Sequence, residues 1–269
     1  TSIDGTSGGV ATDALTINGG TGAITLQAIG ANVALTTLDI NTAATSTAAL
    51  TVPAITTTGA VNIGNSNTSS LTLNAAAYST GGATDYEAGT GSTILLTSAS
   101  PTFTTSGDNL SFSTGNIILS AAGTTTFTTG AGAAGDITVA GTIDGTAGQS
   151  EALTLVSGSG AIALQGTIGG TNPITNLVIN TAGAGTIEMV GIGDSNTIGA
   201  TGTAGIGNTS TATVTLDGSV YKSTGAQTYT AATGGGNIDI TGTSATFTTT
   251  NANVGFATSG VDLANNGTT

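Results

Sequence analysis

Residues 14–27 read ALTINGGTGAITLQ, and residues 152–165 read ALTLVSGSGAIALQ. In both stretches apolar residues alternate with threonine or alanine, and segments rich in glycine separate the alternating runs. Alternation with a period of two is typical of a β-strand, and clusters of glycine, asparagine and serine indicate turns. These stretches therefore predict short strands joined by tight turns, and their likeness predicts an internal repeat.

The likeness extends along the chain as a tandem repeat. Residues 38–43 match residues 177–182, and the offset between matched segments varies from 138 to 144 residues. The aromatic residues recur at equivalent places: Tyr78 with Tyr221, Tyr86 with Tyr229, Phe103 with Phe247, and Phe112 with Phe256. We therefore expect a first copy over residues 1–141 and a second over residues 142–269. The second is expected to be incomplete, because the equivalent of Phe127 would follow residue 269.

Two all-β architectures fit such a chain. In a β-solenoid each coil supplies two or three short strands and stacks on the next coil, whereas in a string of β-sandwiches each repeat forms its own domain. Aromatic residues make up only 3 % of the chain, side chains are small and uniform, and the copies join without a linker. These features favour a β-solenoid, with tandem β-sandwich domains as the alternative. About six coils of roughly 20–25 residues per copy, at ~4.7–4.9 Å each, would give a rod about 55 Å long.

The repeats also resemble a known family. Residues 152–180 and 223–230 look like the repeats of giant bacterial β-strand-repeat surface proteins, which are similar to filamentous-haemagglutinin-type adhesins and autotransporter passengers. The resemblance implies a right-handed parallel β-helix that is exported to the cell surface and used as a stalk, adhesin or fibre. It implies no catalytic residues.

Charged side chains are scarce and almost all acidic. The chain has 1 Lys or Arg, 14 Asp or Glu and no His or Cys, for a formal net charge of −13. The chain therefore lacks the residues that usually form catalytic nucleophile–base pairs and zinc or iron sites, and Lys222 is its only basic residue. Binding to nucleic acid or to anionic membranes would need Lys and Arg, and no apolar run approaches the ~18–20 residues that span a bilayer. We expect no enzyme, no nucleic-acid partner and no membrane insertion.

Calcium is the one metal that the composition leaves open, because carboxylates and carbonyls are its ligands. Acidic residues recur between the copies at two places, Asp4 with Asp144 and Asp13 with Glu151. They are the candidates for a structural calcium site, and no other cofactor is expected. The alternative is that the Ile-Asp-Gly-Thr element is a turn whose Asp accepts backbone N–H bonds.

The recurring tyrosines suggest a second kind of site. Aromatic ring faces pack on sugar rings, so Tyr78, Tyr86, Tyr221 and Tyr229 are candidates for a glycan platform. The alternative is that these rings form an internal stack at the same level of each copy. Because a sugar site also needs polar partners, the internal stack is favoured.

Three functions follow from these observations. The first is a rod-like segment of a long repetitive extracellular adhesin or stalk. The second is a subunit of an extracellular filament, sheath or surface layer, and the third is a carbohydrate-binding module. The expected partners are further copies of the same repeat or the same protein, together with surface glycans.

Overall fold

The chain folds into strands that wind around one axis. The computed structural model describes residues 2–6, 13–130, 134–148 and 150–263, and these residues form no helix. All pairings between the described strands are parallel. The tandem β-sandwich alternative is therefore wrong, because sandwiches are built from antiparallel sheets.

The strands form three long ladders. Sheet 1 contains β1 (Ala14–Ile17), β3 (Thr37–Ile40), β6 (Val61–Ile63), β9 (Thr84–Glu87), β12 (Leu110–Thr114), β15 (Ile137–Val139), β18 (Ile162–Leu164), β20 (Thr186–Met189), β22 (Thr213–Leu216), β25 (Asn237–Ile240) and β28 (Gly260–Leu263). Sheet 2 contains β2 (Ile24–Thr25), β4 (Ala49–Val52), β7 (Ser70–Leu73), β10 (Thr93–Leu96), β13 (Asn116–Leu119) and β16 (Ile143–Asp144), and single-residue bridges at Ile168 and Ile192 continue it to β23 (Val220–Lys222) and β26 (Thr246–Thr248). Sheet 3 contains β5 (Ile55–Thr56), β8 (Ala77–Thr80), β11 (Thr102–Thr105), β14 (Gly123–Thr128), β17 (Glu151–Ser157), β19 (Leu177–Thr181), β21 (Ala204–Ile206), β24 (Gln227–Thr230) and β27 (Val254–Ala257).

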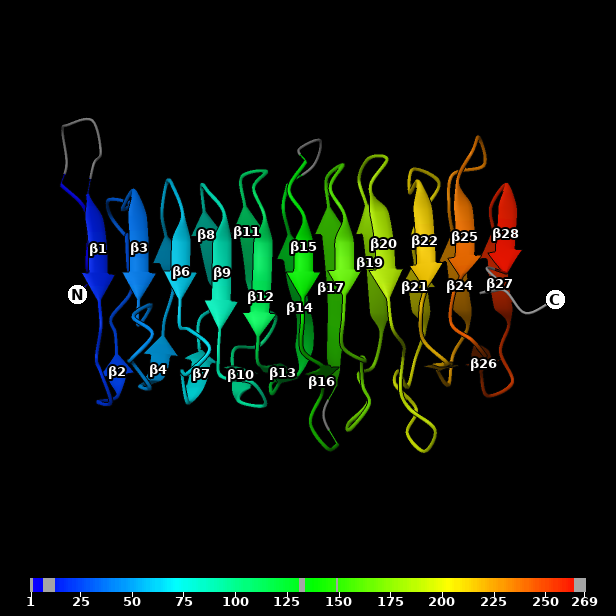
Figure 1. The fold of residues 1–269 in the computed structure, drawn as a ribbon, viewed down its shortest axis with the longest axis horizontal. Coiled ribbons are helices and arrows are strands. Elements are labelled where there is room, and N and C mark those ends of the chain that lie inside the picture. Colours follow the sequence, from blue (N-terminus) through cyan, green and yellow to red (C-terminus); the bar gives the residue numbers. More distant parts are fainter. Residues whose placement is uncertain (1, 7–12, 131–133, 149, 264–269) are drawn as a thin grey trace.

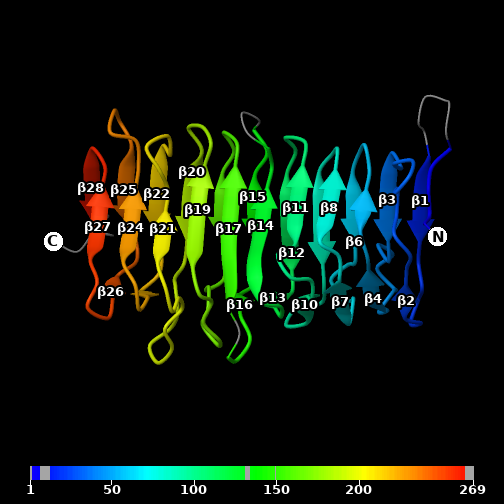
Figure 2. The same cartoon turned by 180° about the vertical axis from the view of Figure 1, so that it is seen from behind.

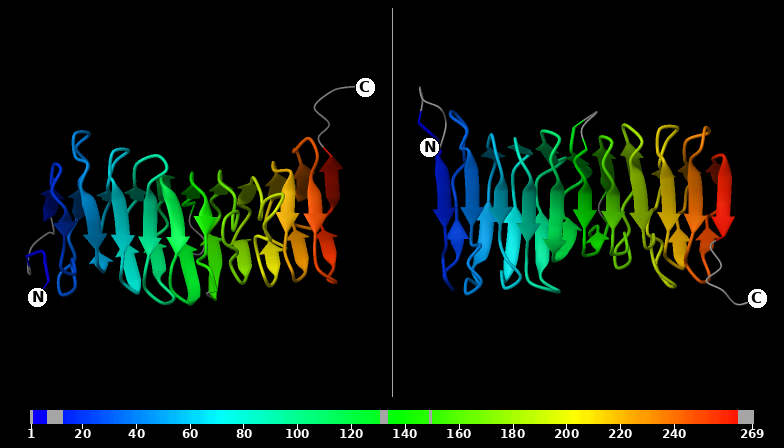
Figure 3. Two further views of the ribbon diagram at one scale, coloured as in Figure 1. Left: turned by 90° about the horizontal axis from the view of Figure 1, so that it is seen from below. Right: turned by 45° about the horizontal axis from the view of Figure 1, so that its top comes forward.

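The winding is right-handed. In Figure 1 the strands of sheet 1 lie in front and run downward, and the chain advances from left to right. The strands of sheet 3 lie behind and run upward, as the reverse view in Figure 2 shows. Sheet 2 closes the coil between them, at the bottom of Figure 1 and toward the viewer in the left panel of Figure 3. The expected right-handed parallel β-helix is confirmed.

Sheet 1 measures the length of the rod. Its 11 strands make ten steps from β1 to β28, and successive Cα partners along it are 23 to 27 residues apart. With ~4.7–4.9 Å between neighbouring strands, the described coils extend over about 48 Å.

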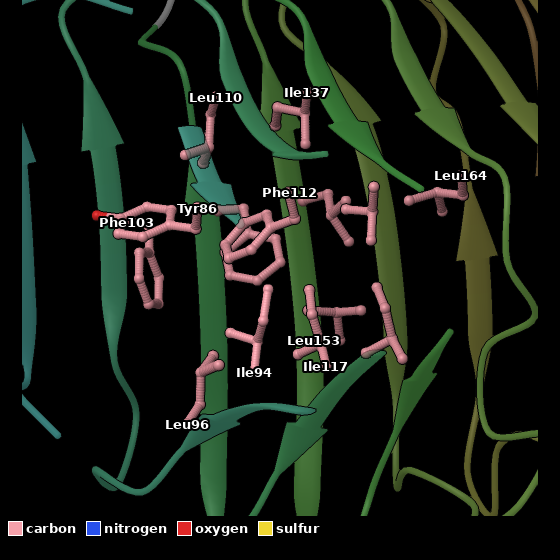
Figure 4. Packing of buried hydrophobic residues seen from close by; sticks show 14 of the residues in the cluster. Tyr86, Ile94, Leu96, Phe103, Leu110, Phe112, Ile117, Ile137, Leu153 and Leu164 are labelled. Carbon is pink, nitrogen blue, oxygen red and sulfur yellow. The ribbon is translucent and has the colours of Figure 1, made fainter. Parts of the chain in front are cut away.

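Alternation places one side chain inside and the next outside along each strand. In β13, Ile117 and Leu119 are buried, whereas Asn116 and Ile118 are only half-buried. Residues from all three sheets meet in one continuous core, part of which is shown in Figure 4. The apolar–Thr–apolar runs of the sequence become strands because this pattern covers the core on one side and meets water on the other.

Most of the aromatic rings belong to this core. Phe103 stacks on Tyr78, with ring centroids 4.6 Å apart, and meets Phe127 edge-on at 5.2 Å. In the second copy Phe247 stacks in the same way on Tyr221, at 5.0 Å. The equivalent rings therefore make equivalent contacts in both copies.

Equivalent segments nevertheless lie on different sheets. Residues 38–40 are in β3 of sheet 1, whereas residues 177–179 are in β19 of sheet 3. Likewise, Phe103 is in β11 of sheet 3 and Phe247 is in β26 of sheet 2. From β1 the chain makes five complete turns to reach β15, which is again in sheet 1. It then passes through β16 in sheet 2 and reaches β17, the equivalent of β1, in sheet 3. One repeat therefore takes five and two-thirds turns rather than the expected six. As a result, each segment of the second copy lies on a neighbouring sheet to the one that holds its equivalent in the first copy.

The boundary between the copies is continuous. In all three sheets a strand of the first copy pairs directly with a strand of the second copy: β13 with β16, β14 with β17 and β15 with β18. The copies share one core, and the division into residues 1–141 and 142–269 stays a prediction of the sequence.

Glycine allows the coils to approach closely at two equivalent corners. Gly64 and Gly207 have φ values of +89° and +75°. A Cβ atom on Gly64 would lie 1.8 Å from the carbonyl oxygen of Glu87, and one on Gly207 would lie 2.0 Å from that of Thr230. No other residue fits both the backbone conformation and the space.

Asparagines fasten the same corners. Asn65 and Asn208 follow the two glycines, and each side-chain amide donates to a carbonyl oxygen of the preceding coil. Their backbone N–H groups donate to the hydroxyls of Thr68 and Thr211, at 2.9 and 3.0 Å. The Asn-x-x-Thr spacing at both places is thus a corner motif.

Candidate functional site

The first pair of calcium candidates holds turns near the start of the chain. Asp4 accepts hydrogen bonds from the backbone N–H of Asn32 at 3.0 Å and from its side-chain amide at 2.8 Å. These bonds, led by the Asn32 N–H and helped by the Ser2 hydroxyl, hold the pKa of Asp4 well below its usual range. Asp13 accepts from the hydroxyl and the backbone N–H of Thr6, which also lower its pKa.

The equivalent pair in the second copy has the same arrangement. Asp144 accepts from the backbone N–H of Thr171 at 2.8 Å, on the next coil. Glu151 is 1 % exposed, and its Oε1 accepts from the hydroxyl of Thr146 at 2.6 Å. Its Oε2 is buried without a hydrogen-bond partner.

These bonds agree with the turn interpretation. Each carboxylate accepts from N–H or O–H groups of its own or the neighbouring loop, which is how Asp fastens a turn. Among the described residues, no three acidic side chains converge as a metal site would require. Calcium binding stays a prediction of the sequence.

The four tyrosines lie inside the rod, and the prediction of a glycan platform from them is wrong. Tyr78, Tyr86, Tyr221 and Tyr229 are each 1 % exposed or less, so no ring face is open to a sugar. The Tyr78 hydroxyl donates to the carbonyl oxygen of Val52, and burial raises its pKa above the usual range. The rings are part of the internal stack, as the alternative interpretation expects.

Carboxylates gather on the outer side of sheet 1. The outward positions of its strands, or residues directly after them, include Asp39, Asp85, Glu87, Glu188, Asp217, Asp239 and Asp262. In sheet 3, by contrast, Glu151 is the only acidic residue of the described strands, and it is buried. One side of the rod is therefore acidic and another is uncharged.

A shallow groove of about 230 Å³ lies on the acidic side. Asp39, Asp85 and Glu87 line it. The Asn62 amide donates to Asp39 at 2.8 Å, and the Ser113 hydroxyl donates to Asp85 at 2.7 Å. Hydrogen bonds between neighbouring coils thus hold two of these carboxylates in place.

The acidic side does not follow the repeat. Asp85 in sheet 1 corresponds to Thr228 in sheet 3, and Asp239 in sheet 1 corresponds to Leu95 in sheet 2. The apolar pattern rotates by one face from copy to copy, whereas the carboxylates stay on the same face. Sequence reasoning missed this surface because it depends on the number of turns in a repeat.

The one basic side chain takes no part in an acid–base cluster. Lys222 Nζ donates to the carbonyl oxygen of Ser195 at 2.6 Å. Asp194 lies nearby, and its pKa is lowered mainly by the backbone N–H groups of Thr197 and Asn196, with a smaller effect of the Lys222 charge. This arrangement closes a surface loop.

Two carboxyl groups on the acidic side meet between coils. The hydrogen bond that protonated Glu188 donates to the Asp217 carboxylate, partial burial and the negative charge of Asp217 together raise the pKa of Glu188. Because the pKa of Glu188 is higher in the folded chain than in the unfolded chain, protonated Glu188 stabilises the fold at low pH. This stabilisation is lost as the pH rises through the pKa of Glu188 in the folded chain.

We expect Glu188→Gln to stabilise the protein at neutral pH by about 0.5 kcal/mol, the scale of exposed charge pairs. The amide keeps a hydrogen bond to Asp217 and removes the repulsion. Below the ordinary Glu value of 4.5 the difference from the unmodified chain should vanish. Urea unfolding at the two pH values measures both quantities. Asp108→Asn removes the same charge from an exposed loop and is the control, and an equal gain from it would contradict the pairing.

Comparisons with protein-family models, curated proteins and solved structures found no match. No helix long and apolar enough to cross a membrane occurs in the described part of the chain.

Proposed function

We propose that this chain is a non-enzymatic, rod-like segment of a long repetitive surface protein that acts outside the cell as a stalk or adhesin. The observation that carries the proposal is the unbroken stacking of the coils, in which sheet 1 runs through 11 parallel strands. Each added coil supplies the same rise, the same kind of core and the same backbone bonds. The number of coils therefore sets the length of the rod, and the continuous stacking makes the rod stiff.

The composition supports a place outside the cell. The coils are held by backbone hydrogen bonds and a core of aliphatic and aromatic side chains, and the chain has no cysteine. A chain of this kind can cross a membrane unfolded and fold afterwards without disulfides.

An adhesive contribution would come from the outer faces of the rod. The acidic side of sheet 1 and the uncharged side of sheet 3 offer two different surfaces to a partner. The third hypothesis, a carbohydrate-binding module, has less support because the tyrosines that suggested it are buried. The second hypothesis, a subunit of an extracellular filament, sheath or surface layer, stays a prediction of the sequence.

Immunogold electron microscopy of intact producing cells tests the proposed function. With an antibody raised against the chain, we expect gold particles outside the cell envelope, separated from it by the length of the stalk. Permeabilised cells and an antibody to a cytoplasmic protein are the controls. Labelling that occurs only after permeabilisation would contradict the extracellular location.

A further inference from the structure

Glu151, at the start of β17, is a buried carboxylate with one unsatisfied oxygen. Its side chain is 1 % exposed, and its Oε2 atom has no hydrogen-bond partner among the described residues. The chain has one basic side chain, Lys222, and its ammonium group is bonded to the carbonyl oxygen of Ser195. Buried carboxylates are normally paired, hydrogen-bonded or bound to a metal ion. The Oε2 atom therefore indicates a partner that the described residues do not supply.

A second oxygen faces the same place. A Cβ atom on Gly145 would lie 3.1 Å from Glu151 Oε2 and 2.6 Å from the carbonyl oxygen of Pro173. The two oxygens thus approach one point beside the glycine, one from β17 and the other from the loop of the next coil. Two oxygens that both carry negative charge repel each other, and a cation between them turns this repulsion into attraction.

Asp144 brings a second carboxylate to this corner. It is 4 % exposed and accepts hydrogen bonds from the backbone N–H groups of Thr171 at 2.8 Å and Asn172 at 3.4 Å. The N–H of Gly145 donates to the carbonyl oxygen of Asn172 at 3.1 Å. The loop of the next coil therefore packs against the segment that carries both carboxylates, and the corner holds two negative charges.

The first copy has the same corner with its carboxylate satisfied. The equivalents of Gly145, Glu151 and Pro173 are Gly5, Asp13 and Ala34. A Cβ atom on Gly5 would lie 2.9 Å from both Asp13 Oδ2 and the Ala34 carbonyl oxygen. Here, however, Oδ2 accepts hydrogen bonds from the backbone N–H and the hydroxyl of Thr6, at 2.5 and 2.7 Å. The arrangement of oxygens is thus repeated, but in the second copy the carboxylate oxygen is left without a donor.

We propose that Glu151 Oε2 and the Pro173 carbonyl oxygen bind one Ca²⁺ at this corner, with Asp144 supplying the second negative charge. Calcium takes carboxylate and carbonyl oxygens in flexible arrangements, whereas Mg²⁺ demands a near-ideal octahedron. The ion balances the charge of both carboxylates, so no third acidic side chain is needed. It also ties β17 to the loop that leads into β19, at the boundary between the copies. The inference goes beyond the proposed stalk function, which does not depend on an ion.

Calcium titration of the full chain tests the site. The protein is stripped with a chelator and titrated with CaCl₂ by isothermal calorimetry, at a constant ionic strength that keeps the screening of the −13 net charge unchanged. We expect one Ca²⁺ to bind per chain. With free Ca²⁺ at about 100 times the dissociation constant, the ratio of folded to unfolded chains in urea should rise about 100-fold. MgCl₂ is the control. A chain that binds no calcium, or that responds equally to both ions, would overturn the proposal.

Glu151→Gln separates this site from the other carboxylates. The amide keeps the shape of the side chain and supplies a donor for the Pro173 carbonyl oxygen, so the variant should fold and lose the calcium response. The matched control Asp13→Asn removes the equivalent carboxylate of the first copy, whose oxygen already has donors, and should keep the response.

Two outcomes of this comparison would contradict the site. Calcium binding that survives Glu151→Gln would place the ion on other carboxylates, such as those of the acidic side of sheet 1. An equal loss of the response in Asp13→Asn would show that it follows the total charge rather than this corner. The stalk function survives either outcome, since immunogold labelling tests it separately.

Discussion

Phe103→Ala is expected to lower the free energy of unfolding by about 3–5 kcal/mol, the usual loss when a large buried aromatic side chain is truncated. Phe103 is 1 % exposed and contacts the rings of Tyr78, Tyr86, Phe112 and Phe127. The cavity would lie between successive coils, where the aromatic rings fill the rod. Urea unfolding followed by far-ultraviolet circular dichroism measures the loss.

The equivalent residue provides a matched control within the same chain. Phe247 keeps the stacking on Tyr221 but is only partly buried, because no ring corresponding to Phe127 covers it among the described residues. Phe247→Ala should therefore cost about 1–2 kcal/mol, roughly half the value for burying a whole side chain. Equal losses at the two positions would contradict the prediction, because the contact between Phe103 and Phe127 would then add nothing to stability.

Gly64→Ala is expected to cost about 2–5 kcal/mol, from about 1–2 kcal/mol for the left-handed backbone and about 1–3 kcal/mol for overpacking. The added Cβ would meet the carbonyl oxygen of Glu87, and neither coil can move without breaking ladder bonds of sheet 1. The loss is measured by the same urea unfolding.

Gly91→Ala separates these two causes. Gly91 has a similar φ of +77°, but a Cβ atom there would have no neighbour within 4 Å. This variant should cost only about 1–2 kcal/mol, from the backbone alone. If both variants lose the same amount, the close approach of the coils at Gly64 contributes nothing to stability.

The strands and their stacking could be predicted from the sequence because the repeated apolar–Thr–apolar alternation indicates both. Runs such as residues 15–17, 38–40 and 61–63 fall within β1, β3 and β6, and they pair with one another in parallel. Few aromatics, small side chains and the absence of a linker point to stacked coils, because a sandwich needs larger side chains to fill its core.

The sites were harder to predict because alternation does not say which side of a strand faces inward. Tyr78 and Tyr86 could be placed on a surface or in a stack from sequence alone, and the structure shows that both are buried. The acidic side of sheet 1 was not predictable at all. Between 21 and 29 residues separate neighbouring coils in the three sheets, so the number of turns in a repeat cannot be counted from turn residues.

A repeat of five and two-thirds turns makes the number of copies matter for direction. Gene duplication that adds one copy to such an array would turn everything beyond the insertion by a third of a circle relative to what precedes it. A terminal domain at the far end would then have a different orientation about the rod axis, and three added copies would be needed to restore the original orientation. Arrays that vary in steps of three would keep a fixed orientation, whereas single-copy variation would change it.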